Sequence, residues 1–253
     1  MNIQWYPGHM TKAKRAMKED VKLVDLVIEL VDARAPLASR NPDIDSLAAG
    51  KGRVILLNKA DLASEKANAA WITYFESQGF QVMKIDARAK ATLKQLNALI
   101  QEACKEKIER DRRRGNKPGV TKGNQWIRLN KQVELLDTPG ILWPKFEDQR
   151  VGLLLAFLGS INDEILEKDE LASELADYLR NITPGLLKER YGIEEDGKKP
   201  YELLDEIAAA RACLTKGGVN DLTKAARLLL DEFRGGKLGR ITLEMPEKKE
   251  EAE

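Results

Sequence analysis

The sequence is poor in the residues that build metal, redox and nucleophilic sites. Its 253 residues include two cysteines, Cys104 and Cys213, and one histidine, His9. Two cysteines this far apart form none of the spacings of zinc or dithiol redox sites, and they do not require an oxidising compartment. We therefore expect neither a disulfide-stabilised fold nor a cysteine-based metal centre.

Long hydrophobic runs and a strong net charge are also absent. The longest apolar run, near Gly152–Ile161, is too short to span a bilayer, and no secretory signal opens the chain. The formal net charge is +1, so no overall field marks the chain as a nucleic-acid or membrane binder. These absences predict a cytoplasmic protein without a membrane partner.

The first 150 residues carry short apolar runs that predict strands buried on both faces. These runs are 23–33, 53–59 and 80–86. A helical pattern over 64–78 separates the last two, and strand alternating with helix predicts an α/β domain with a mainly parallel sheet. Two further short strands around Asn130–Lys131 predict a hairpin. We expect this domain to span residues 1–149.

Helical periodicity replaces the strand pattern after about Arg150. Apolar residues recur on one stripe in two segments: Leu171, Leu175, Tyr178 and Leu179, and then Leu222, Ala225, Ala226, Leu229, Leu230 and Phe233 behind Asp221 as a cap. We interpret 150–243 as a smaller, all-helical domain. The acidic tail, 244–253, is predicted to be disordered because it has few apolar residues to bury.

The polar residues that end the 53–59 run have the chemistry to read a guanine base. An Asp carboxylate can accept hydrogen bonds from guanine N1–H and the exocyclic amine, and adenine offers no matching pair. An Asn side chain can face N7 and O6, while a Lys stem lies over the ring. Asn58, Lys59 and Asp61 fit these roles, and the alternative is an ordinary polar loop after a strand.

Two later segments fit metal-dependent phosphate chemistry. In "DTPG" Asp137 can hold a metal-bound water, and Gly140 can present its backbone N–H to a γ-phosphate. In "NKPGVT" the hydroxyl of Thr121 can bind Mg²⁺. The alternatives are a simple strand-to-loop turn for the first segment and common Pro-Gly turn chemistry for the second.

Together these segments resemble the circularly permuted GTPases of ribosome assembly, and most of all the bacterial ribosome biogenesis GTPase A family. The shared motifs are "WYPGHM", "VDARAPLASRNP", "LLNKAD", "PGVT" and "LLDTPGILWPKFED". In this family the base-reading loop precedes the phosphate-binding elements, so the order of motifs here is the expected one. The resemblance implies a GTPase domain with a mainly parallel sheet, a small helical C-terminal domain, GTP or GDP with Mg²⁺ as ligands, and a monovalent cation as a possible addition.

The resemblance also implies roles for residues that pattern alone does not assign. It implies that Asp86, Ala87 and Arg88 form the loop behind the guanine, where the family usually has Ser-Ala-Lys. Ile141 stands where Ras-like proteins have a water-orienting glutamine, which makes His9 a candidate for that catalytic role. The alternative for His9 is a structural turn.

The resemblance further implies a monomer whose helical domain docks on ribosomal RNA of the large subunit. The basic candidates lie in "LLKERYG" and "FRGGKLGRIT", where lysine and arginine accompany glycine or aromatic residues. They are Lys188, Arg190, Arg234, Lys237 and Arg240. Plain solvent-exposed surface is the alternative reading of these residues.

One part of the family pattern is absent. No G-x-x-x-x-G-K-[ST] phosphate loop occurs, and "RDRRRG" runs directly into "NKPGVT" at Gly115–Asn116. Charge-assisted hydrogen bonds contribute about 1.5–3 kcal/mol each, and micromolar affinity corresponds to only about 8 kcal/mol. Losing five such bonds should abolish useful GTP binding.

The absence has an architectural consequence as well. In the family the strand before the phosphate loop lies in the middle of the sheet, so the strands that end at Val31 and Asp137 must pair directly or leave the sheet in parts. We therefore favour a GTPase-family factor in late assembly of the large subunit, with its own nucleotide binding and hydrolysis impaired. The alternative is a nucleotide-independent ribosomal RNA-binding protein or an inactive remnant.

Overall fold

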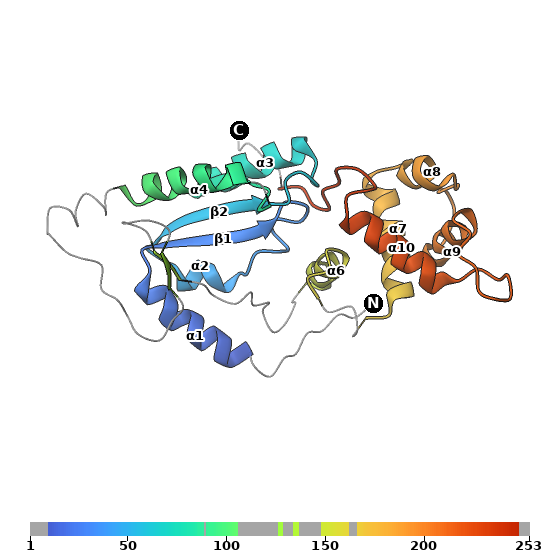
Figure 1. Ribbon diagram of the computed structural model, residues 1–253, viewed down its shortest axis with the longest axis horizontal. Coiled ribbons are helices and arrows are strands. Elements are labelled where there is room, and N and C mark those ends of the chain that lie inside the picture. The colour runs from blue at the N-terminus through green and yellow to red at the C-terminus, as the bar shows by residue number, and fades with distance from the viewer. Residues whose placement is uncertain are drawn as a thin grey trace, which may run out of the picture.

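The computed structural model describes residues 10–88, 90–105, 126–128, 134–136, 148–161 and 166–247. Its main sheet has three parallel strands in the order β1-β2-β3. Figure 1 labels β1 and β2. They are β1 (Leu26–Asp32), β2 (Gly52–Asn58) and β3 (Gln81–Lys84). Asp32 lies opposite Asn58, so β1 and β2 end level with each other at their carboxyl ends. The predicted parallel α/β sheet is confirmed.

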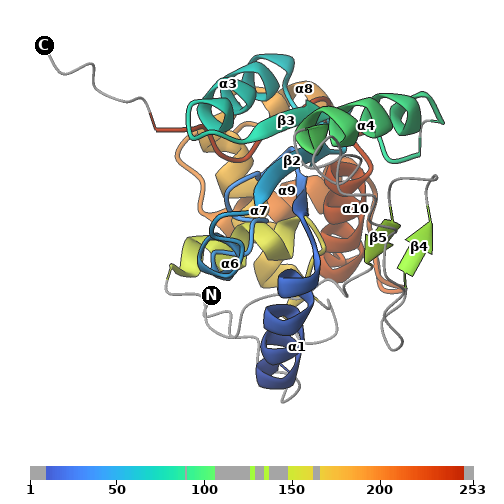
Figure 2. The same cartoon turned by 90° about the vertical axis from the view of Figure 1, so that its left-hand side faces the viewer.

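Helices cover both faces of this sheet (Figure 2). On one face, α3 (Glu65–Glu76) buries Trp71 and Phe75, whose rings stack with centroids 5.5 Å apart against the apolar side chains of β1 and β2. On the other face, α4 (Lys90–Ala103) covers Val54 and Leu56 of β2. α1 (Met10–Leu23) precedes β1, and the short α2 (Asp43–Leu47) lies between β1 and β2.

The predicted hairpin is present but separate from the main sheet. β4 (Trp126–Arg128) and β5 (Glu134–Leu136) pair antiparallel, and within the described ranges neither strand bonds to β1, β2 or β3. The outer edge of β1 therefore has no neighbouring strand in the part of the chain that the structure describes. Leu30 of β1 is 58% exposed. Of the two expected outcomes, direct pairing or a sheet in parts, the described residues show the second.

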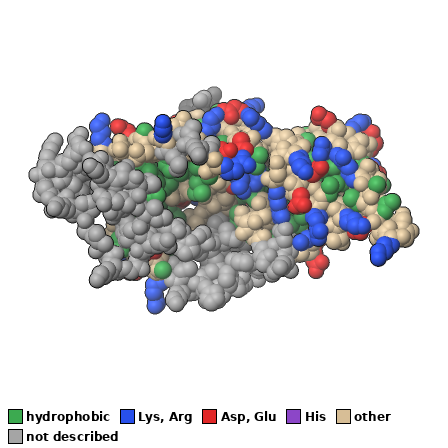
Figure 3. Space-filling model, viewed as in Figure 1, with side chains coloured by type: hydrophobic (Ala, Val, Ile, Leu, Met, Phe, Trp, Pro, Cys, Tyr) green, Lys and Arg blue, Asp and Glu red, His purple; other side chains and the backbone are tan. Residues whose placement is uncertain are grey.

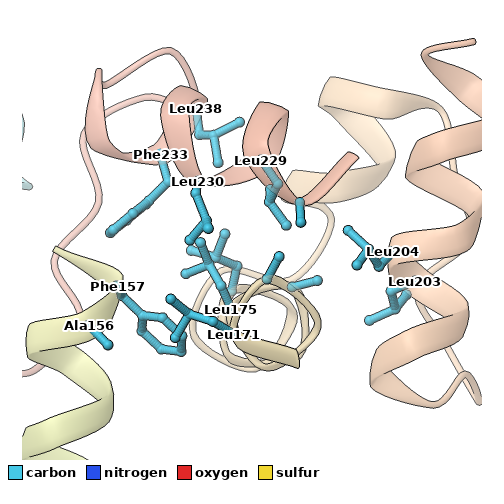
Figure 4. Close-up of a cluster of buried hydrophobic side chains, with 14 of the residues drawn as sticks. Ala156, Phe157, Leu171, Leu175, Leu203, Leu204, Leu229, Leu230, Phe233 and Leu238 are labelled. Carbon is cyan, nitrogen blue, oxygen red and sulfur yellow. The ribbon is translucent and has the colours of Figure 1, made fainter. Parts of the chain in front are cut away.

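The C-terminal part is helical, as predicted. It comprises α6 (Gln149–Phe157), α7 (Lys168–Ile182), α8 (Leu186–Tyr191), α9 (Pro200–Ala210) and α10 (Leu222–Arg234). Leucine and phenylalanine side chains of these helices converge on one core around α7 (Figure 4). α10 begins where the sequence predicts, because the Asp221 carboxylate accepts a hydrogen bond from the Lys224 amide at 3.0 Å. No helix in the described ranges is long and apolar enough to cross a membrane.

The chain returns from the helical part to the sheet after α10. The Leu243 amide donates to the Arg34 carbonyl at 2.6 Å, and the Trp71 indole N–H donates to the Glu244 carbonyl at 3.0 Å. The Glu244 carboxylate accepts from the Ala38 amide at 2.9 Å. The expected disorder of 244–253 is therefore wrong for Glu244, because backbone donors hold it, and residues 248–253 lie outside the described ranges.

Candidate base-reading site

The segment after β2 turns sharply at the carboxyl end of the sheet. Lys59 has a φ of 56°, a left-handed conformation that few non-glycine residues adopt. The Ala60 amide donates to the Ile85 carbonyl at 3.2 Å, and the Ala33 amide donates to the Asn58 carbonyl at 2.8 Å. The turn is thus fixed between the ends of β1 and β3. Open parallel sheets bind ligands at this edge.

Asn58 joins two of the predicted base-reading segments. Its Oδ1 accepts a hydrogen bond from the Ala87 amide at 3.2 Å, so the loops 58–61 and 86–88 lie side by side. Asn68 of α3 supports the first loop by donating to the Ala60 carbonyl at 3.0 Å. The structure therefore brings together residues that are 29 positions apart in the sequence.

Among the described residues, one carboxylate oxygen of Asp61 has a hydrogen-bond donor and the other has none. Oδ2 accepts from Arg88 Nη2 at 2.8 Å. Oδ1 is shielded from solvent, and no group among the described residues donates to it. A buried carboxylate oxygen without a donor is costly in a folded protein. Its presence here is the feature expected of a group that a ligand N–H completes.

Lys59 is held by a residue that the sequence analysis did not single out. Its Nζ lies 2.9 Å from Oδ2 of Asp32, and the same carboxylate accepts from Nε and Nη2 of Arg34 at 3.0 and 2.9 Å. Burial by itself raises the pKa of Asp32, but the hydrogen bonds and positive charges of Arg34 and Lys59 outweigh it, and the net pKa lies below the ordinary value. The available signal was an acidic residue ending the strand next to β2.

Asp86 and Arg88 make most of their hydrogen bonds to each other. Arg88 donates to the Asp86 carboxylate through Nε at 2.9 Å, Nη2 at 3.1 Å and its backbone amide at 3.0 Å. The side-chain hydrogen bond from Arg88 is the main cause that lowers the pKa of Asp86. Asp86 thus acts on the site through the position it gives to Arg88.

The described residues include those predicted to read the base but not those predicted to bind the phosphates and the metal. His9, Thr121, Asp137 and Gly140 lie outside the described ranges. Within those ranges no cluster of three or more His, Cys, Asp or Glu side chains can hold a metal ion. The donors and acceptors around Asn58 fit a guanine base, whereas the fit of Mg²⁺ rests on sequence alone.

The five basic candidates for RNA contact occupy different environments. Arg190 forms a fork with Glu232 at 3.0 and 2.7 Å, and Arg234 donates to the carbonyls of Phe157 and Ala156 at 3.0 and 2.9 Å. Both guanidinium groups therefore serve the fold.

The other three basic candidates lie on the surface. Lys188 pairs with Glu194 at 2.8 Å, and Lys237 and Arg240 are exposed. On the face drawn in Figure 3, Lys and Arg side chains alternate with Asp and Glu, without a uniformly basic patch over the described residues in view.

Comparison with known proteins places this chain in a family. The chain is 43% identical to ribosome biogenesis GTPase A of Bacillus cereus over 281 positions, which covers 98% of this chain and 95% of the relative. It is 35% identical to the protein of the same name from Thermotoga maritima, covering 97% and 95%. The chain belongs to the ribosome biogenesis GTPase A family.

Two other comparisons agree with this membership. The family model of the "50S ribosome-binding GTPase" matches residues 95–204. The crystal structure of GNP-bound YlqF from T. maritima has a TM-score of 0.67 at 30% identity, covering 94% of this chain and all of that one. The GDP-bound TM YlqF structure gives 0.69 at 29%, covering 92% and all of that chain. A ribosome biogenesis GTPase A fold, circularly permuted, is thus shown for this chain.

Proposed function

We propose that this chain is an assembly factor of the large ribosomal subunit that keeps the guanine-reading pocket of its family but binds GTP weakly and does not hydrolyse it at a useful rate. The observation that carries the proposal is the Asp61 carboxylate, whose buried Oδ1 lacks a donor among the described residues while Asn58 stands at the same strand end.

The base-reading half of the proposal follows from donor and acceptor geometry. Guanine N1–H and its 2-amino group are donors that match a carboxylate, and adenine has no such pair at that edge. A pocket that leaves a buried acceptor unpaired with the wrong base discriminates strongly. Asp61 therefore selects guanine, and Asn58, tied to the Ala87 amide, keeps the two loops in register.

Binding of the GTP phosphates is weakened because the chain has no phosphate loop. The alignment with the Bacillus cereus relative spans 281 positions, so that protein has at least 28 residues (281 less 253) without a counterpart here. Thr121 and Asp137 would bind Mg²⁺, Gly140 the γ-phosphate, and His9 would orient water, with a monovalent cation as a further ligand. Without backbone amides that cradle the phosphates, these residues bind GTP too weakly for turnover.

The proposed binding to the ribosome rests on the helical part. The relatives are named ribosome biogenesis GTPases, and we extend this to a monomer that docks in the cytoplasm on ribosomal RNA of the large subunit. Lys188, Lys237 and Arg240 are the basic residues free enough of the fold to contact phosphates. Arg190 and Arg234 instead make contacts within the helical part, to Glu232 and to the Phe157 carbonyl.

Titration of a fluorescent GTP analogue tests the phosphate half. We expect no saturation at tens of micromolar, and saturation in that range would refute the weakened phosphate site.

Guanosine in saturation-transfer NMR tests the proposed binding of the guanine base. We expect binding in the millimolar range that Asp61→Asn removes and that adenosine does not share. Glu76→Gln, an exposed carboxylate change on α3, is the matched control and should leave guanosine binding intact.

A nucleotide-independent RNA-binding protein is the second candidate, and the separate β4-β5 sheet favours it because it shows the GTPase sheet in parts. Sedimentation of the chain with large-subunit assembly particles, without GTP and with GTP at millimolar concentration to fill even a weak site, separates the two. Equal association under both conditions supports the second candidate. Lys237→Ala and Arg240→Ala should each weaken association. Each should also reduce the slope of the logarithm of the association constant against the logarithm of the salt concentration by about 1. Lys216→Ala in the exposed 214–220 loop should do neither.

A further inference from the structure

The guanine-reading carboxylate is already in contact with a guanidinium group of the same chain. Arg88 Nη2 donates to Asp61 Oδ2 at 2.8 Å. Arg88 follows Ala87, whose amide binds Asn58, so the side chain reaches Asp61 from the loop that would back the base. The two residues lie 27 positions apart, and only the parallel pairing of β2 with β3 brings them together.

The Arg88 guanidinium offers the chemical pattern that guanine offers. Carbon 2 of guanine bonds to three nitrogens, and two of these, N1 and the 2-amino nitrogen, present parallel N–H donors. This is the arrangement of an arginine side chain, which carboxylates bind as a planar fork. A group that recognises Asp61 in this way competes with guanine for the same oxygen atoms.

Arg88 holds this position with few constraints. Its side chain is 75% exposed, and its fork is completed by Asp86 at 2.9 and 3.1 Å. Since only one of its N–H groups reaches Asp61, Oδ1 of that carboxylate stays without a donor among the described residues. An exposed ion pair of this kind contributes little to stability. Arg88 can therefore leave Asp61 while it remains bound to Asp86.

We propose that Arg88 is a specificity-determining gate of the base pocket: it occupies the Asp61 carboxylate when no base is bound, and guanine enters by displacing it. The exchange replaces one N–H donor at Oδ2 with two from guanine, and the second satisfies the unpaired Oδ1. Asp86 is the positioning residue of this gate, because it keeps the guanidinium bound before and after displacement. The inference rests on the proposed base-reading function.

Guanosine is the appropriate probe because it is neutral and carries no phosphate that Arg88 could attract. In saturation-transfer NMR, Arg88→Ala should bind guanosine about two- to fivefold more tightly than the parent chain, the range that loss of an exposed ion pair produces. Adenosine binding should not change. Arg88→Gln keeps the side chain as far as Cδ without the guanidinium charge and should give a similar gain, which would show that the gain does not come from deleting the whole side chain.

The salt dependence of guanosine affinity is a second test, because a purely structural role of Arg88 would not produce it. Exposed ion pairs are screened at high ionic strength. Guanosine should therefore bind the parent chain more tightly as salt rises from 50 mM towards about 1 M, while the affinity of Arg88→Ala stays flat. Convergence of the two affinities at high salt supports the gate.

The possible outcomes separate the gate from the proposed function. Equal or weaker guanosine binding by Arg88→Ala, with clear binding by the parent chain, overturns the gate alone and leaves base reading in place. Absence of guanosine binding by both proteins overturns base reading, and the gate falls with it. Binding by Arg88→Ala alone is the strongest result in favour.

Discussion

The helical part and the sheet part of this chain differ in how completely their elements are partnered. Helices α6 to α10 share one buried core (Figure 4). Away from its ends, a helix forms its backbone hydrogen bonds within itself. The sheet part has two smaller apolar clusters, a hairpin on its own and a β1 edge without a neighbouring strand in the described ranges. A strand depends on its neighbour for backbone partners and a helix does not, so loss of one element harms a sheet more.

The two parts are joined through the loop after β1. Arg34 is 1% exposed, binds Asp32 on the sheet side and donates through Nη1 to the Arg234 carbonyl at the end of α10 at 3.3 Å. Ala35 and Ala38 of the same loop belong to the helical core. The stability of the sheet part therefore depends on a contact with the helical part.

Removal of Arg34 should have the largest effect on how the sheet part and the helical part unfold. Arg34→Ala leaves the buried Asp32 carboxylate with Lys59 and the backbone amide of residue 34, and it removes the bond to α10. Loss of one partner from a buried pair costs about 3–5 kcal/mol. Urea unfolding followed by circular dichroism should change from one transition to two, with the sheet part unfolding first. Arg34→Lys should recover part of the loss. A single transition with unchanged midpoint would show that Arg34 does not couple the two parts.

Truncation in the helical core comes next in magnitude. Leu175 of α7 is fully buried, and Leu175→Ala should lower the free energy of unfolding by about 2–5 kcal/mol because it removes apolar contacts and leaves a cavity. The transition of the helical part should shift to lower urea. A loss below about 1 kcal/mol would mean that this core is looser than its burial indicates.

The charge on Asp32 should make the junction sensitive to acid. The pKa of Asp32 lies below its ordinary value of 3.8 in the folded chain, so its contribution is present above 3.8 and is lost as the pH falls through the folded pKa. Asp32→Asn should cost about 1.5–3 kcal/mol at pH 7, as expected for hydrogen bonds to charged groups.

Urea titrations of the parent chain and Asp32→Asn at several pH values check this prediction. The difference between the two should stay constant from neutral pH down to about pH 5 and shrink below that. A difference that grows on acidification would contradict the sign of the pKa shift.

The smallest effect belongs to the open edge of the sheet. Leu30 is 58% exposed, so Leu30→Ala should change the free energy of unfolding by less than about 0.5 kcal/mol. Leu57→Ala on the neighbouring strand β2, where the side chain is fully buried, is the matched comparison and should cost several times more. If Leu30→Ala is as costly as Leu57→Ala, the edge of β1 is covered in solution.

Sequence patterns were sufficient wherever the signal was local. Continuous apolar runs predicted all three strands of the main sheet to within a few residues. The i, i+4 spacing of Leu171 and Leu175 predicted the buried stripe of α7, and Asp221 was correctly expected to cap α10. The family motifs predict base-reading roles for Asn58 and Asp61, and in the structure the two residues lie at or just after the carboxyl end of β2.

The features that sequence analysis missed depend on contacts between distant segments. Asp32 reaches Lys59 because β1 and β2 pair in register, and Glu244 is anchored because the chain returns to the loop after β1. Glu244 was assigned to a disordered tail on its composition. Composition reports how much a segment can bury but not which backbone donors will meet a carboxylate.

The amino-acid sequence by itself determined the elements, the family and the absence of a phosphate loop, because periodicity, capping and motifs act over a few residues. Only the tertiary structure decided that β4 and β5 stand apart from the main sheet, that Arg34 links the sheet to α10, and that Arg88 lies on Asp61. The reason is physical: each of these outcomes depends on which strand edges and charged groups meet in space, and residues far apart in the chain carry no local mark of that meeting.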